Sequence, residues 1–166
     1  MPIPYDGTNE REVMEGFLRE ETVGHLAMAC GDELYVVPLN YTYVDGRILF
    51  HCALQGRKLD MIRRNPNVCF EVSRQVGPPG PHSDDPCDAP FESVICWGIA
   101  RVIDDAHERQ AVLNAFQARY DKPTGPREPM SLDRAATCGA VEIRVTRMTG
   151  RRSPGKDRLV WEFGPE

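Results

Sequence analysis

A cluster of cations in the middle of the chain has the spacing of an anion-binding site. Arg57, Lys58, Arg63 and Arg64 lie within eight residues, directly after Gly56. Apolar residues recur between these charges at helical spacing, so a short helix is predicted over this segment. The free N–H groups of a helix N-terminus, next to two cations, favour a phosphate. Arginine and lysine in a first turn are also typical of a solvated helix face, and both interpretations stay open here.

The cysteines do not have the spacing of a metal site. The chain contains six cysteines, but no CxxC or CxxH pair, so we expect no structural zinc and no bound metal. Four of them, Cys30, Cys52, Cys69 and Cys96, lie in apolar strand-like runs, where a thiol packs as a small hydrophobe. The N-terminus has neither the basic start nor the apolar core of a secretory signal, so we expect a cytoplasmic protein with free thiols.

Length, charge and hydropathy exclude several classes of protein. A chain of 166 residues can form one domain with a buried core, and we predict a single domain over 1–166. The net charge of −5 argues against nonspecific binding of nucleic acid, which needs many cations. Charged residues interrupt the apolar runs well before the ~20 residues that a membrane-spanning helix requires, so we expect no membrane partner.

The first half of the chain is predicted to contain two helices and four strands. Apolar residues at helical spacing indicate an amphipathic helix over 9–21. Residues rich in Val, Tyr and Thr indicate the strands, which cover 23–29, 34–44, 47–53 and 67–74. Asp45-Gly46 is a strong signal for a hairpin between the second and third of these strands. Asn65-Pro66 ends the short helix over 56–64, because the residue before proline avoids the α region.

The second half begins with a long loop over 76–90, which contains five prolines and which we interpret as an insertion. Strands are predicted over 91–103, 140–148 and 159–163, and a helix from 104–105 to about 120. A linker rich in proline and glycine follows at 121–129, and a basic tail covers 151–166. Strands joined mostly by tight turns indicate an α+β fold with an antiparallel sheet, closed as a small barrel. No GxGxxG or GxxxxGK[ST] motif is present.

The central motif resembles that of a known family. The segments FHCALQGRK at 50–58 and NPNVCF at 65–70 are similar to the FMN-binding core of the pyridoxamine 5′-phosphate oxidase-like superfamily. With Val37-Pro38, Tyr41, Asp45-Gly46 and the strand around Trp97, the chain is most similar to the branch of nitroimidazole-resistance reductases. The resemblance covers about 13–145 and implies an antiparallel split β-barrel with flanking helices.

The resemblance also implies a role for individual residues. Arg57 and Lys58 would pair with the FMN phosphate, and β-strand residues would line the ribityl chain and the isoalloxazine ring. The superfamily forms homodimers with flavin sites at the subunit interface, so Trp97 would contact the flavin of the other subunit. Gly56 stands where the oxidases often have serine, which removes one hydroxyl contact to phosphate. The implied cofactor-binding residues are Val37, Pro38, Leu39, Asn40, Phe50, His51, Cys52, Ala53, Gly56, Arg57, Lys58 and Trp97.

His51 is the candidate catalytic residue. An imidazole titrates near neutral pH, so His51 could donate a proton to a substrate that accepts hydride from reduced flavin. The alternative is that His51 only forms hydrogen bonds to the cofactor or to a neighbouring strand. His25 lies in a predicted strand and is expected to be structural. His82 lies in the predicted loop and is expected to be solvated.

The leading hypothesis is an FMN-dependent oxidoreductase that reduces a small organic substrate, with a nitroaromatic compound as the candidate. Two alternatives stay open: a flavin-binding or electron-carrier module without a dedicated substrate, and a haem-binding split barrel in which His51 or His82 ligates iron. A deazaflavin cofactor is a further possibility. Pyridoxal-phosphate oxidase activity is not expected, because the C-terminal cations do not have the arrangement of that enzyme's arginine-rich motif.

Overall fold

The computed structural model describes residues 10–76, 90–120, 128–153 and 158–162, with the backbone alone at 153 and 158–162. The predicted insertion at 76–90 lies almost entirely outside the described residues, as do His82, Cys87 and most of the predicted linker. Within the described helices, none is long and apolar enough to cross a membrane.

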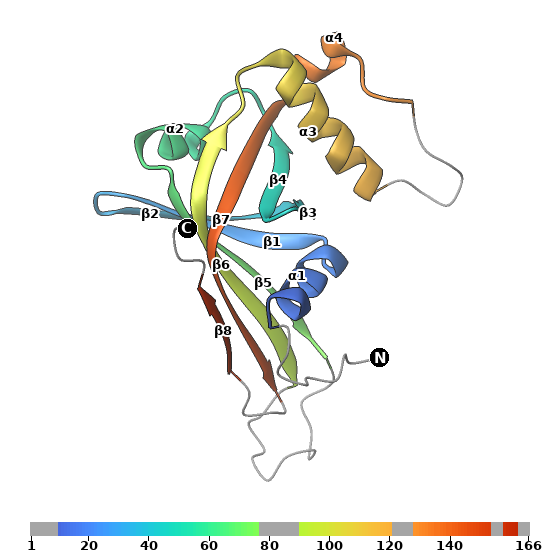
Figure 1. Cartoon of the computed structure of the whole chain (residues 1–166). Helices are drawn as coiled ribbons and strands as arrows, with labels where there is room; N and C mark the ends of the chain where they lie inside the picture. Colours follow the sequence, from blue (N-terminus) through green and yellow to red (C-terminus); the bar gives the residue numbers. More distant parts are fainter. Residues whose placement is uncertain (1–9, 77–89, 121–127, 154–157, 163–166) are drawn as a thin grey trace.

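The described strands form one antiparallel sheet (Figure 1). The strands are β1 (Val23–Cys30), β2 (Glu33–Asn40), β3 (Thr42–Val44), β4 (Arg47–Cys52), β5 (Asn67–Gln75), β6 (Phe91–Val102), β7 (Gly139–Ser153) and β8 (Arg158–Glu162). Their order is β2-β1-β5-β6-β7-β4-β3, and β8 also pairs with β7. The helices are α1 (Glu10–Glu20), α2 (Arg57–Arg64), α3 (Ala106–Arg119) and α4 (Leu132–Ala135).

The long strand β7 divides the sheet. Its first part pairs with β4 as far as Arg144, and its later part pairs with β8 from Arg147 onward. On its other edge, β6 pairs along almost the whole of β7, with one irregularity between Trp97 and Gly98. Two different strands thus occupy successive parts of one edge, and the sheet divides there. The architecture is a split β-barrel of the α+β class, as predicted.

The predicted strand over 34–44 is wrong in one respect, because the chain breaks it at Tyr41. The residues before the break form β2 and pair with β1, whereas those after it form β3 and pair with β4. The Tyr41 side chain is fully buried, and its hydroxyl donates to the carbonyl of Leu18 at 2.8 Å. Its ring packs edge-on against Phe70, with 5.0 Å between the ring centroids. This buried anchor turns the chain from one half of the sheet to the other.

The other predicted elements agree with the structure within about two residues, apart from one strand and one helix. The strand predicted over 140–148 continues to Ser153, because β6 pairs with it as far as that residue. The short helix α4 was not predicted; Ser131 caps it by accepting from the N–H of Arg134. The hairpin turn at Asp45-Gly46 is confirmed, with φ of 48° and 76°, the left-handed values that a tight hairpin turn requires.

The core lies inside the curled sheet and is built from aligned strands. Leu26 of β1 pairs with Phe70 of β5, Phe70 with Cys96 of β6, and Cys96 with Met148 of β7. All four side chains are buried, as is the apolar face of α1 and of α2. Burial of Cys96 confirms the packing role predicted for that thiol, whereas Cys30, Cys52 and Cys69 are only half-buried.

Candidate functional site

The junction between β4 and α2 is the centre of the candidate site. α2 begins directly after Gly56, and its buried residues Leu59, Met61 and Ile62 hold it against the core. The N–H groups of Leu59 and Asp60 both donate to the carbonyl of Gly56, which leaves the N–H groups of the first helical residues facing outward, as at any helix start. The predicted helix and its first-turn cations are therefore where the sequence placed them.

The end of α2 is fixed by Asn65. Its backbone is extended, with φ of −143°, as expected before Pro66. The Asn65 side-chain amide donates to the carbonyl of Ala29 in β1 at 2.8 Å, and the Asn65 backbone N–H donates to the carbonyl of Met61. The side-chain bond to Ala29 attaches the end of α2 to β1, so the helix has a defined position relative to the sheet.

Arg57 lies against the beginning of β2. Its guanidinium lies 2.8 Å from the carboxylate of Glu33 and 4.4 Å from the centre of the Tyr35 ring. Arg64, at the other end of α2, lies 3.3 Å from the second oxygen of the same carboxylate. The hydrogen bond from Arg57 is the main cause that lowers the pKa of Glu33 below its ordinary value.

Lys58 lies over the buried ring of Phe50 in β4. Its ammonium group is 5.3 Å from the centre of the Phe50 ring, and the Phe50 side chain is fully buried. Cys52, two residues along β4, is half-buried. Burial raises the pKa of the Cys52 thiol, and the positive charge of Lys58 partly opposes that effect. Lys58 therefore lies close to both Phe50 and Cys52 of β4.

The predicted segment 37–40 does not lie on a single face of β2. Its side chains alternate, so Val37 and Leu39 are half-buried and pack against the core, whereas Pro38 and Asn40 are exposed on the opposite face. Tyr35 shares the face of Val37 and Leu39, and it also packs against the core. Tyr35 and Glu33 were not among the predicted site residues, although their i, i+2 spacing with Val37 places both on this face.

His51 faces helix α3. Its ring packs edge-on against Phe116, with 4.6 Å between the centroids, and Phe116 in turn contacts Tyr120. The Tyr120 hydroxyl donates to the carbonyls of Tyr41 and Thr22. Since neighbouring residues of a strand point to opposite faces, His51 points away from Cys52. The structure therefore separates the candidate catalytic histidine from the thiol and ammonium of the cation site.

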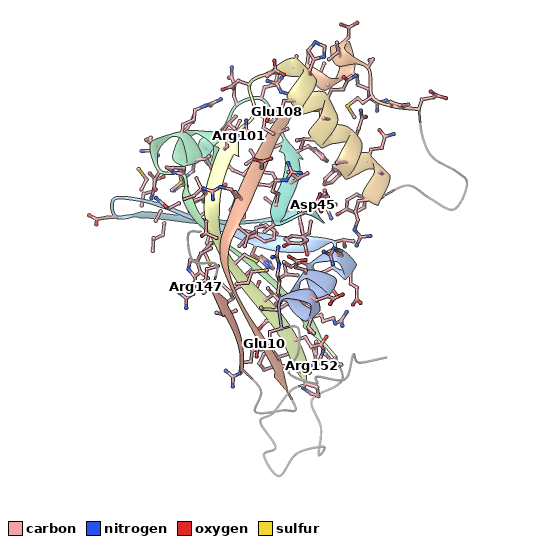
Figure 2. All side chains as sticks on the ribbon, viewed as in Figure 1. Glu10, Asp45, Arg101, Glu108, Arg147 and Arg152 are labelled. Atoms are coloured by element: carbon pink, nitrogen blue, oxygen red, sulfur yellow. The ribbon has the colours of Figure 1, made fainter. Side chains whose placement is uncertain are left out.

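Helix α3, which contacts His51, is attached to the sheet by charges at its first turn. The guanidinium of Arg101 in β6 binds the carboxylate of Glu108 and lies 3.3 Å from Glu142 in β7. Figure 2 shows Arg101 and Glu108 close together where α3 meets the long strands. At the other end of α3, Arg119 donates to the carbonyl of Glu20. The position of Phe116 beside His51 is thus held from both ends of the helix.

Trp97 lies on the outer face of the sheet, away from the core. It is half-buried beside Cys69 of β5, and the guanidinium of Arg147 lies 4.5 Å from the centre of its ring. On the same face, Nδ1 of His25 lies 3.0 Å from the carboxylate of Glu71, in line with the structural role expected for His25. Within the described residues, no group of three or more His, Cys, Asp and Glu side chains could hold a metal ion.

A hollow of about 470 Å³ also opens on the sheet, at the ends of β5 and β6. It is lined by Glu71, Ser73, Arg74, Gln75, Pro90, Phe91 and Ser93. None of the predicted cofactor-binding residues lines it. The hollow is therefore distinct from the cation site on α2.

The backbone conformation of Gly56 predicts that a larger residue at this position destabilises the fold. Its φ is 140° and ψ is 165°, a region that is essentially limited to glycine. We expect Gly56→Ala to lower the free energy of unfolding by about 1–3 kcal/mol, measured by urea denaturation. Gly16→Ala in α1 is the matched control; a Cβ there meets nothing within 4 Å, and alanine should stabilise the helix by about 0.5–1 kcal/mol. Equal stability of the two variants would contradict this prediction.

Two solved structures have a fold similar to that of this chain. The fold is similar to that of a candidate 5-nitroimidazole antibiotic resistance protein from Bacteroides thetaiotaomicron, with a TM-score of 0.71 and 23% identity over 84% of this chain and 82% of that one. A FAD and haem binding protein from Mycobacterium smegmatis has a TM-score of 0.76 at 14% identity, over 94% of this chain and 85% of that one. At these identities the likeness shows the fold alone.

Two further relatives are nearer in sequence. A FAD-binding protein from Mesorhizobium loti is 25% identical, with a TM-score of 0.61 over 86% of this chain and 94% of that one. An uncharacterized protein from Rhizobium meliloti is 30% identical over 63 residues, which are 38% of this chain; the matched stretch spans only 41% of the length of that relative. A family model described as pyridoxamine 5′-phosphate oxidase matches residues 10–152. With this match over most of its length, the chain belongs to the pyridoxamine 5′-phosphate oxidase family.

Proposed function

We propose that the chain is an FMN-binding oxidoreductase that reduces a small organic substrate, with a nitroaromatic compound as the candidate. The observation that carries the proposal is the position of Arg57 and Lys58 in the first turn of α2. Arg57 lies beside Tyr35 of β2, and Lys58 lies over Phe50 of β4. The FAD-binding relative from Mesorhizobium loti supports a flavin as the ligand.

The residues of the site fit the two chemical parts of FMN. A guanidinium, an ammonium and the outward N–H groups of a helix start suit the phosphate. The half-buried row of Tyr35, Val37 and Leu39 offers an apolar surface for a ring system. Because β2 is at the edge of the sheet, its outer backbone groups are available for hydrogen bonds to the polar edge of a ring, except at Pro38, which has no N–H.

The chain's own residues would bind and orient the reactants. Arg57 and Lys58 would hold the phosphate, and β2 would position the ring; FMN, when bound, would supply hydride transfer. Because His51 faces α3, it would donate a proton to a substrate that lies on the α3 side of β4. Phe116 restricts the orientation of the imidazole through its edge-on contact at 4.6 Å. The sheet therefore supports both the cations Arg57 and Lys58 and the imidazole of His51, and α3 packs against that imidazole.

A homodimer would complete the site. The outer sheet face leaves apolar side chains in solvent, including Leu34 at 75% exposure and Val36 at 59%. Val36 pairs with Ala27, which is aligned through Cys69 with Trp97, so the apolar surface continues across the sheet. A second copy of the chain is the proposed cover for this face, and Trp97 would contact the flavin of that copy.

The flavin site is tested by charge reversal. We expect the double variant Arg57→Glu with Lys58→Glu to lose bound flavin, because two repelling charges would face the phosphate. The measurement is the visible spectrum of the purified protein, with the released chromophore identified by mass. Arg134→Glu, on exposed α4, is the control and should keep its flavin. Retention of FMN by the double variant would remove the phosphate assignment, and a Soret band would favour the haem alternative.

Reoxidation kinetics separate a reductase from an electron carrier. The chemically reduced holoprotein should be reoxidised faster by a nitroimidazole or a quinone than by unrelated small acceptors, in a stopped-flow experiment. We expect His51→Gln to slow this reaction about 10²-fold or more at neutral pH and to weaken its pH dependence. Equally slow reoxidation by every acceptor would support the carrier. An unchanged rate in the histidine variant would leave His51 a purely structural role.

The dimer is tested by sedimentation velocity. The wild-type protein should sediment as a species of twice the chain mass, and Val36→Glu should shift it toward the monomer, because a charge would have to be buried at the interface. Leu132 on α4 is also exposed, and Leu132→Glu is the matched control. A monomeric wild type would contradict the proposed interface.

A further inference from the structure

The carboxylate of Glu33 occupies the guanidinium fork of Arg57. Its Oε1 accepts a hydrogen bond from Nε of Arg57 at 2.9 Å and lies 2.8 Å from Nη2. These two nitrogens form one edge of the guanidinium group, and such an edge can also bind a phosphate with two parallel hydrogen bonds. The contact connects the start of β2 with the start of α2.

The contact can be exchanged for another ligand. The two side chains are 53% and 37% exposed, and exposed ion pairs of this kind are weak. When Arg57 binds a different anion, Glu33 remains paired with Arg64, because Oε2 of Glu33 lies 3.3 Å from the Arg64 guanidinium. The Tyr35 ring, 4.4 Å from the guanidinium, limits how far Arg57 can move.

We propose that Glu33 is an internal competitor for the anion that Arg57 binds, and that it thereby sets how strongly the chain prefers FMN over unphosphorylated riboflavin. This inference rests on the proposed function. An ionised carboxylate beside Arg57 blocks part of the phosphate site and repels the phosphate. Riboflavin has no phosphate, so Glu33 has little effect on its binding.

The sign of the effect distinguishes competition from support. If Glu33 orients Arg57 for the phosphate, then loss of the carboxylate should weaken the binding of FMN. If Glu33 competes, the same change should strengthen it. Glu33→Gln keeps the size of the side chain and removes its charge, so it is the appropriate variant. Glu12→Gln on α1, an exposed position, makes the same change in net charge without changing the surroundings of Arg57.

The experiment measures the dissociation constants of FMN and riboflavin by flavin fluorescence, for wild type and both variants, after removal of bound flavin. In Glu33→Gln, the dissociation constant of FMN should fall about three- to five-fold, as expected for removal of one exposed ion pair, while that of riboflavin stays unchanged. Glu12→Gln should match wild type. The gain should shrink at high salt, because the charges are exposed.

The outcomes separate the two proposals. An unchanged ratio of FMN to riboflavin affinity in Glu33→Gln, or weaker binding of FMN, would overturn the competitor role while leaving the flavin site intact. If neither the wild-type protein nor Glu33→Gln binds FMN at any concentration, the proposed function is contradicted instead. A circular dichroism spectrum and melting temperature equal to wild type show that Glu33→Gln is folded.

Discussion

The fold depends on the burial of Tyr41 between two halves of the sheet. Its hydroxyl is bound to the carbonyl of Leu18, its ring packs on Phe70, and its own carbonyl accepts from Tyr120. Burial raises the pKa of Tyr41 well above its ordinary value, so the phenol stays a neutral donor. Because the chain turns at this residue, β3 pairs with β4, while β2 stays paired with β1 at the edge of the sheet. The half-buried inner face of β2 therefore lies beside α2.

The candidate site is a small positive region on a chain of net charge −5. Arg57 and Lys58 differ in their surroundings, although they are neighbours in sequence. Arg57 is exposed and paired with Glu33, whereas Lys58 is half-buried over Phe50. Lys58 is therefore the less easily displaced of the two charges, and Arg57 is the one whose availability depends on a nearby carboxylate.

Successive side chains of β2 and of β4 point to opposite faces of the sheet, so the two faces have different surroundings. The inner face of β2 carries Tyr35, Val37 and Leu39 beside the cation site, while its outer face exposes Leu34 and Val36. In β4, Cys52 lies near Lys58, whereas His51 contacts Phe116 of α3. Within one chain, α2 lies beside Phe50 and Cys52 of β4, and α3 covers His51. In the proposed dimer, a second copy would cover the face of β2 that exposes Leu34 and Val36.

The amino-acid sequence by itself determined the local features of this protein. Asp45-Gly46 specifies a tight turn, Asn65-Pro66 ends α2, and the cations of α2 follow Gly56, because each depends on backbone preferences of adjacent residues. The motif also identified the family. Only the tertiary structure decided the break at Tyr41, the pairing of Arg57 with Glu33 and the packing of His51 on Phe116. These contacts join residues far apart in the chain, and their formation depends on how the strands pair rather than on any local preference.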